Sequence, residues 1–576
     1  MVEQTRNGIY RINSISMKTL HIIPILLSLF AHFDVVAASS EPVQAQQGMV
    51  VSASRLASEV GVSIMQRGGN SFDAAAAAGF ALAVTHPSAG NLGGGGFLVA
   101  HTKDGQSITL DFREMAPAAA DKDMYLDDAG EIIPGLSLLS PLASGVPGSV
   151  DGLLKIWQDY GSDNLSRRQL LSPAIRLARK GFPISSQLAK SLNANHERFA
   201  RDPGASKIFK RQDGRPWREG DLLVQRDLAA TLKRIARLGR NGFYDGRIAA
   251  RIADQHEKTN GLITLSDLAD YQSKYRPPVV GTYKEFGVVS MGPPSSGGIL
   301  LIHMLNMLEP HDIGAYGWNS KRSIHLLTEV QRRAYADRSL HLGDSDFYDV
   351  PVRWLLSKSY ARERASTINP IKATLSSEVY AGAVPIAESE ETTHYSVYDR
   401  LGNAVSVTIT LNGAFGSGIV IEGAGFLMNN EMDDFSAKPG APNLYGLIGS
   451  EANAIAPGKR MLSSMTPTIV LKGDKPFLIL GSPGGSTIIT TVLQNILNVT
   501  QHGMSIQGAI NAPRHHSQWL PDTISHEPGA LTKGTLEELK SLGHSLIPRA
   551  TIGQANGIQI TPEAIYGAPD PRSDNV

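Results

Sequence analysis

Residues 391–412 constrain the possible folds of this chain more than any other stretch. Two runs of alternating, β-branched residues, 392–397 and 403–411, flank a cluster of turn-forming residues centred on Leu401. The pattern predicts a β-hairpin, and symmetric pairing about Leu401 would set Thr392 opposite Thr410. One face would be apolar and belong to the core, with Thr393, Tyr395, Val397, Val405, Val407 and Ile409. The other face would carry Thr392, His394, Ser396, Ser406, Thr408 and Thr410, more hydroxyl groups than burial alone readily explains.

Composition and charge exclude several classes of function. The chain has 576 residues, of which 42% are hydrophobic and 19% charged, so it can bury a large core and needs no disulfides to do so. Because Lys+Arg and Asp+Glu both number 54, no net field would recruit nucleic acid or an anionic membrane. There is no cysteine, which excludes disulfides, thiolate metal sites and a cysteine nucleophile.

The amino terminus resembles a signal peptide. An apolar run at 21–30 follows Lys18, and the small residues of Val36-Ala37-Ala38 precede a polar stretch. We therefore expect residues 1–38 to be a leader and the mature protein to be periplasmic or secreted. The apolar run is too short for a transmembrane helix, which needs about 20 residues. The alternative is an uncleaved tail.

Further along the chain, sequence patterns predict helices at 56–67, 71–84 and 170–182, the last with Ser172 as its cap. The glycine run 93–96 lacks the lysine of a phosphate-binding loop and precedes a strand, so it indicates close backbone packing. A strand at 108–114 would deliver Arg113 to its end. Taken alone, Arg113 beside an acidic residue would more often be a surface ion pair.

The run Thr392-Thr393-His394-Tyr395-Ser396-Val397, with Asn429–Phe435 downstream, resembles the γ-glutamyltranspeptidase family of N-terminal nucleophile hydrolases. The resemblance extends from about residue 47 to the end. It implies a mixed α/β (α+β) fold, a four-layer αββα sandwich. It also implies a precursor that cuts itself before Thr392, giving a large subunit, 39–391, and a small subunit, 392–576, which together form one compact domain. The polar loop 381–391 suits a scissile segment, although such loops are more often only solvated.

In this family the new N-terminal threonine is the nucleophile, which the resemblance assigns to Thr392. A threonine hydroxyl needs a base, and a free N-terminal amine has a pKa of about 7.7–8.0, close to where proton transfer is useful. Thr410, paired with Thr392, could orient its hydroxyl. The turn after the strand 477–480 can direct two backbone N–H groups at one point, and the resemblance assigns the oxyanion hole to Gly484 and Gly485. The histidines His394, His515 and His516 are then structural or supporting.

The resemblance also implies a substrate site. It assigns Arg113, Ser463 and Ser464 to the substrate α-carboxylate, and Asn412, Glu431 and Asp434 to its α-amino group. A guanidinium suits a carboxylate because its planar fork binds both oxygens. The acidic cluster could instead hold a metal ion, although its spacing lacks the EF-hand order. The Gly/Pro-rich loop 439–449 resembles the lid of many bacterial members, with Tyr445 as its closing residue.

The implied activity is cleavage of the γ-glutamyl amide bond of glutathione and related compounds, with transfer to amino acids, peptides or water. No cofactor, metal, nucleic acid or membrane insertion is implied. One alternative is a related acylase acting on glutaryl-cephalosporin-type side chains, which lack the α-amino group. Another is an uncleaved, non-catalytic binding protein that uses the same pocket.

Overall fold

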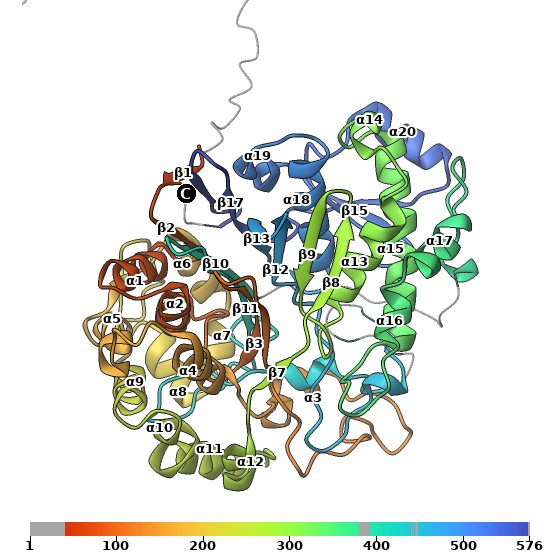
Figure 1. Ribbon diagram of the computed structural model, residues 1–576. Coiled ribbons are helices and arrows are strands. Elements are labelled where there is room, and N and C mark those ends of the chain that lie inside the picture. The colour runs from red at the N-terminus through yellow and green to blue at the C-terminus, as the bar shows by residue number, and fades with distance from the viewer. Residues whose placement is uncertain are drawn as a thin grey trace, which may run out of the picture. The chain divides into compact units, whose positions relative to one another are not determined.

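Two antiparallel β-sheets lie face to face in the computed structural model, which describes residues 41–379, 392–438, 441, 443, 447 and 449–573 (Figure 1). The first sheet has the order β1 (Val43–Ala45), β18 (Ile565–Ala568), β17 (Asn556–Ile560), β13 (Lys475–Gly481), β12 (Thr468–Lys472), β9 (Phe286–Ser290) and β8 (Val279–Tyr283). The second has the order β2 (Gly48–Ser52), β10 (Thr393–Asp399), β11 (Ala404–Thr410), β3 (Gly95–His101), β4 (Ser107–Phe112) and β7 (Lys274–Arg276). A buried apolar cluster with members from both sheets, including Phe97, Val99, Ile469 and Ile479, fills the space between them.

Helices cover the outer face of each sheet, which confirms the four-layer αββα sandwich. Those that share a buried apolar cluster with the β10–β11 sheet include α1 (Arg55–Gln66), α2 (Ser71–Thr85), α4 (Ser149–Tyr160), α5 (Arg167–Lys180), α6 (Ser186–Ala194) and α9 (Arg226–Leu238). Those that share a buried apolar cluster with the other sheet include α13 (Gly297–Leu308), α15 (Lys321–His341), α17 (Lys358–Ser366), α18 (Thr487–Thr500) and α19 (Ile506–Asn511). Every residue of α2 is buried, as its alanine-rich sequence predicts.

The predicted hairpin is confirmed with its register. Strands β10 and β11 pair Thr393 with Ile409 and Val397 with Val405, as symmetric pairing about Leu401 requires. The apolar face packs into the core beneath the helices. The predicted glycine packing is also confirmed, because a Cβ on Gly94 or Gly96 would lie 2.1 or 2.3 Å from a carbonyl oxygen of the hairpin or its extension.

The hydroxyl-rich face of the hairpin differs from the expectation, because it lies between the two sheets. Ser396 and Ser406 are fully buried, and the Ser406 hydroxyl donates to the Leu480 carbonyl (2.9 Å) and accepts from the Thr468 N–H (3.0 Å). His394 is also buried and contacts the hydroxyls of Thr408 (2.9 Å) and Ser396 (3.0 Å). Burial with hydrogen-bond partners therefore explains the middle of this face, and only its Thr392–Thr410 end is available for chemistry.

The predicted cap of α5, Ser172, lies six residues after the observed cap, Ser166. The helix begins at Arg167, and Ser166 caps it through a reciprocal hydrogen-bond pair with Gln169. Pro173 lies inside the helix and cannot donate to the Gln169 carbonyl, but the Ser172 hydroxyl donates to that carbonyl at 3.1 Å. Ser172 therefore replaces the missing backbone hydrogen bond and does not cap the helix.

The described residues from 41 onward form a single compact unit by their contacts. Within the part of the chain that the structure describes, no helix is long and apolar enough to cross a membrane. The leader, residues 1–38, and the loop 381–391 lie outside the described residues.

Candidate active site

Strand register brings one group of site residues to the same end of the β10–β11 sheet. Thr410 ends β11 and pairs with Gly95 at the start of β3, and Gly96 in turn pairs with Phe112 at the end of β4. Because neighbouring strands are antiparallel, Thr392 before β10 and Arg113 after β4 come to this same end.

The facing sheet contributes the second group in the same way. Thr468, at the start of β12, pairs with Leu480 near the end of β13 and with Ser290 at the end of β9. Ser463 and Ser464 therefore lie close to the turn that contains Gly484 and Gly485. Since Ser406 bonds to both Thr468 and Leu480, the two sheet ends are held against each other.

A small cavity of about 20 Å³ is where these groups meet. Nine of the predicted site residues line it: Arg113, Thr392, Thr410, Asn412, Glu431, Asp434, Ser463, Ser464 and Gly485. Gly484 lines an adjoining larger cavity to which Thr392 also contributes. Tyr445 lies outside the described residues.

The segment after β11 is shaped by one residue with left-handed backbone. Asn412 has a φ of +71°, and its N–H donates to the Thr410 hydroxyl at 2.8 Å. Its side-chain amide donates to the Asn430 carbonyl at 2.9 Å, which joins this segment to the helical turn η3 (Glu431–Asp434). Asparagine tolerates positive φ better than most residues, which suits it to this position.

The turn between β13 and α18 requires its glycines. Gly484 and Gly485 have φ values of +131° and +51°, a region that residues with a Cβ rarely adopt. A Cβ on Gly484 would also lie 2.4 Å from the Thr487 hydroxyl oxygen. The turn directly precedes the helix, where backbone N–H groups have no partner within the helix and can face a developing negative charge.

Three carboxyl groups surround Arg113, which is fully buried. Its guanidinium bonds to Glu431 and to Asp434, and it lies 3.7 Å from Glu114. Burial alone would lower the pKa of Arg113, but these carboxylates outweigh it and hold the pKa above its ordinary value. Burial raises the pKa of Glu114 to about 7, and it also raises the pKa values of Glu431 and Asp434 against the effect of Arg113. This occupation by a guanidinium argues against a metal ion at the acidic cluster.

Sequence reasoning missed three residues beside this cavity. Arg338 on α15 lines it, and Ser296, at the start of α13, receives a hydrogen bond from Arg338 at 2.9 Å. Glu114 follows Arg113 directly, but the sequence offered no sign that its carboxyl is buried. α15 buries charged residues along most of its length, so no amphipathic stripe marks Arg338 in the sequence.

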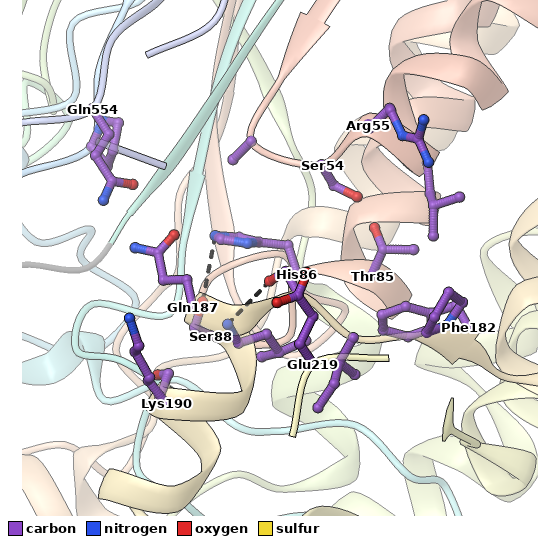
Figure 2. A pocket seen from close by; sticks show the side chains of 18 of the residues that line it. Ser54, Arg55, Thr85, His86, Ser88, Phe182, Gln187, Lys190, Glu219 and Gln554 are labelled. Atoms are coloured by element: carbon purple, nitrogen blue, oxygen red, sulfur yellow. Dashed lines mark hydrogen bonds between the residues drawn. The ribbon is translucent and has the colours of Figure 1, made fainter. Parts of the chain in front are cut away.

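The larger cavity, about 790 Å³, opens on the other side of Thr392 and Gly484. Figure 2 shows its side chains, which come from α1 (Arg55), α6 (Gln187, Lys190) and the segment before β17 (Gln554). His86 forms part of the wall beside Ser88 (3.4 Å), and burial lowers the pKa of His86 to about 4. The exposed charges on this cavity are those of Arg55, Lys190 and Glu219.

Two facing antiparallel sheets between helical layers, with a threonine at the start of a central strand, define the class of N-terminal nucleophile hydrolases. The family model described as Gamma-glutamyltranspeptidase matches residues 57–576. The glutathione hydrolase proenzyme of Escherichia coli (strain K12) is 48% identical over 533 residues, covering 92% of this chain and 91% of that protein. The chain therefore belongs to the γ-glutamyltranspeptidase family.

Solved structures share this architecture. Cephalosporin acylase from Bacillus halodurans superposes with a TM-score of 0.82 at 26% identity, covering 93% of this chain and 96% of that one. Helicobacter pylori γ-glutamyltranspeptidase has a TM-score of 0.58 at 46% identity, covering 59% of this chain and 97% of that one. The sequence identity of this chain is therefore higher to the transpeptidase than to the acylase.

Proposed function

We propose that this protein is a self-processing γ-glutamyltransferase and glutathione hydrolase whose nucleophile is Thr392. The observation that carries the proposal is the convergence of Thr392, Thr410 and the Gly484–Gly485 turn beside a buried cluster of opposite charges. A hydroxyl nucleophile, a source of oxyanion stabilisation and a charge-complementary pocket are the elements that acyl transfer from an amino-acid side chain requires.

The reaction proceeds in two balanced steps. The Thr392 hydroxyl oxygen attacks the γ-carbonyl carbon of the substrate, and the free Thr392 amine accepts the hydroxyl proton. The carbonyl oxygen becomes negative and is stabilised by backbone N–H groups of Gly484 and Gly485. The C–N bond then breaks, the amine returns the proton to the leaving nitrogen, and a γ-glutamyl ester remains. Water or an acceptor amine attacks this ester and restores Thr392.

Recognition of the γ-glutamyl group uses the charges at Arg113. The substrate α-carboxylate binds Arg113 together with the hydroxyls of Ser463 and Ser464, and the α-ammonium binds Asn412, Glu431 and Asp434. Arg113 now forms ion pairs with Glu431 and Asp434. The substrate carboxylate would take the place of these carboxylates at Arg113, and the substrate ammonium would take the place of Arg113 at Glu431 and Asp434. A zwitterion can make this exchange without leaving a buried charge unpaired, whereas a ligand with one charge cannot.

The larger cavity is the place for the leaving group and the acceptor. It shares Thr392 with the small cavity, so a substrate whose glutamyl head lies in the small cavity extends past Thr392 into the larger one. Cysteinylglycine and amino-acid acceptors carry a carboxylate, and Arg55 and Lys190 outnumber Glu219 at the rim. These exposed charges would contribute modest affinity.

We propose that loop 439–449, including Tyr445, forms a lid over the small cavity. Two of its described members bear on the small cavity: Asn443 donates to the Asp434 carboxylate at 3.1 Å, and Leu447 lines the cavity. A loop anchored at Asp434 would cover the γ-glutamyl group and favour small substrates such as glutathione.

Mass spectrometry and N-terminal sequencing of the purified protein test self-processing. Cleavage before Thr392 would leave 576 − 391 = 185 residues in the small chain, beginning Thr-Thr-His-Tyr. We expect the wild type to be cut and to hydrolyse a γ-glutamyl anilide, and Thr392→Ala to stay whole and inactive. A folded wild-type chain that stays uncut would instead support the binding-protein alternative.

The acylase alternative is favoured by the fold that the chain shares with cephalosporin acylase. Its glutaryl substrates lack the α-amino group, so they would not need Asp434. We expect Asp434→Asn to lower kcat/KM for a γ-glutamyl anilide about 100-fold, since a buried ion pair to the ammonium is lost. Cleavage of a glutaryl anilide by the same variant provides the comparison. Unchanged γ-glutamyl activity would disprove the role of Asp434.

Export is proposed from the leader pattern of residues 1–38. Fractionation of expressing cells tests it: the processed enzyme should appear outside the cytoplasm with residues 1–38 removed. Processed enzyme confined to the cytoplasm with an intact amino terminus would contradict export.

A further inference from the structure

A second arginine, Arg338, lies in the wall of the small cavity and has no place in the recognition scheme above. It belongs to α15, and only 5% of its surface is exposed. Its Nε donates to the Ser296 hydroxyl at 2.9 Å, and a terminal nitrogen donates to the Ser464 hydroxyl at 3.3 Å. The guanidinium therefore reaches the wall of the cavity that also contains Ser463 and Ser464.

Arg338 differs from other buried arginines of this protein in its partners. Arg113 has three carboxylates, Arg460 pairs with Asp111, and Arg514 pairs with Asp570 at 2.8 Å. Among the described residues, no carboxylate lies within ion-pair distance of Arg338. Burial lowers the pKa of Arg338 only to about 10, so it stays charged at neutral pH. A buried charge without an ion-pair partner is costly unless a ligand supplies one.

The hydrogen bonds of Arg338 lead to both serines of the proposed carboxylate site. The Ser464 hydroxyl accepts from Arg338, so its own proton is directed elsewhere and can be donated to a ligand. Ser296 accepts from Arg338 and donates through its hydroxyl to the Ser463 carbonyl at 2.7 Å. The Ser296 N–H donates to the same carbonyl at 2.8 Å. Arg338 thus holds the backbone of Ser463 and the side chain of Ser464 in place.

We propose that Arg338 supplies a second positive charge for the α-carboxylate of the γ-glutamyl group and positions Ser464 to bind it. The inference rests on the proposed function and deepens it. Arg113 bonds to two carboxyl groups and lies beside a third, whereas Arg338 donates hydrogen bonds to hydroxyl groups and has Asp434 only as a more distant counter-charge, so a ligand carboxylate gains more from Arg338. The carboxylate would lie between the two arginines, and the ammonium on the side of Glu431 and Asp434.

The test compares two inhibitors of γ-glutamyl anilide hydrolysis that differ only at the α-carboxylate. L-Glutamate has this carboxylate, and its α-amide replaces it with a neutral carboxamide. We expect Arg338→Gln to raise the inhibition constant of glutamate about 10-fold or more, as loss of hydrogen bonds to a charged group predicts, and that of the α-amide less than twofold. Arg338→Lys should recover part of the loss, because it keeps the charge. KM for the anilide should rise more than kcat falls.

Arg322→Gln is the matched control, since Arg322 lies on the exposed first turn of the same helix and stacks on Tyr316. It should leave both inhibition constants unchanged. Equal weakening of both inhibitors by Arg338→Gln, or no weakening, would overturn the inference. If Arg338→Gln does not self-process, Arg338→Lys and Ser464→Ala are compared in the same way, and a loss that is not selective for glutamate again overturns it. A wild type that hydrolyses no γ-glutamyl anilide would instead remove the proposed function itself.

Discussion

At the scale of single residues, charge balance in the small cavity decides what can bind. Arg113, Arg338, Glu431 and Asp434 line this cavity, and the buried carboxyl group of Glu114 lies 3.7 Å from Arg113. If Glu114 is protonated, the remaining charges are two positive and two negative, which matches a zwitterionic ligand. Burial raises the pKa of Glu114 to about 7, so its protonation changes near neutral pH.

Glu114 makes stability depend on pH, and the sign follows from its raised pKa. Below about pH 4.5 the carboxyl is protonated in both the folded and unfolded chains. As pH rises towards 7, the unfolded chain ionises first, so the folded state loses stability, by about 3 kcal/mol in total at about 1.4 kcal/mol per pKa unit. Glu114→Gln stays neutral and should match the wild type near pH 4.5 and be more stable at pH 8.

Chemical denaturation at a series of pH values measures this difference, and Glu257→Gln, an exposed site, is the control. Parallel pH curves for Glu114→Gln and the wild type between pH 5 and 8 would show that folding does not raise the pKa of Glu114.

At the scale of elements, the turn between β13 and α18 is the one whose backbone shape bears most directly on the proposed reaction. Gly484→Ala would place a Cβ against the Thr487 hydroxyl at a strained φ of +131°. The turn must shift, and the Gly484 and Gly485 N–H groups shift with it. We expect kcat for γ-glutamyl anilide hydrolysis to fall about 100-fold, the usual effect of losing one oxyanion donor.

Gly473→Ala is the matched control for this prediction. Gly473 also has positive φ, +60°, and forms the β12–β13 turn, but a Cβ there meets no atom within 4 Å. It should cost about 1–2 kcal/mol of stability through backbone strain and leave activity unchanged. If both variants lost stability equally and kept their activity, the Gly484 turn would have no part in oxyanion binding.

Sequence patterns predicted elements well where the relevant contacts are local. The β10–β11 register followed from period-two alternation and a central turn, which lie within one stretch of chain. The burial of Ser396 and Ser406 did not follow, because their partners on β13, β12 and β17 are 62 to 160 residues away. The start of α5 was misplaced because Pro173 is typical of a first turn, while Ser172 makes it acceptable in the helix interior.

At the scale of the whole molecule, local sequence patterns did not predict the four layers, nor that residues far apart in the sequence meet where the ends of the two sheets face each other. The resemblance to the γ-glutamyltranspeptidase family predicted both. The family motifs contain most residues of the proposed site, because these motifs are short and contiguous. Arg338 has no such motif, and only the packing of α15 against the cavity reveals it. A charged residue on a helix is usually predicted to be exposed to solvent, but the tertiary fold buries Arg338 on α15.

The arrangement of strands also predicts how the two chains behave after cleavage before Thr392. β10 and β11, from the small chain, lie between β2 and β3 of the large chain. In the other sheet, β18, β17, β13 and β12 of the small chain lie between β1 and β9 of the large chain. Each sheet is therefore continuous only when both chains are present, and neither chain can keep its own core without the other.

We expect the two chains to elute together in size-exclusion chromatography at any dilution and salt concentration, and to separate only in denaturant. Each chain isolated in denaturant should fail to refold alone, because it would expose unpaired strands and the apolar faces of half-built sheets. The uncut Thr392→Ala protein marks the elution volume of the intact assembly. A small chain that dissociates on dilution, or folds by itself, would contradict this arrangement of strands.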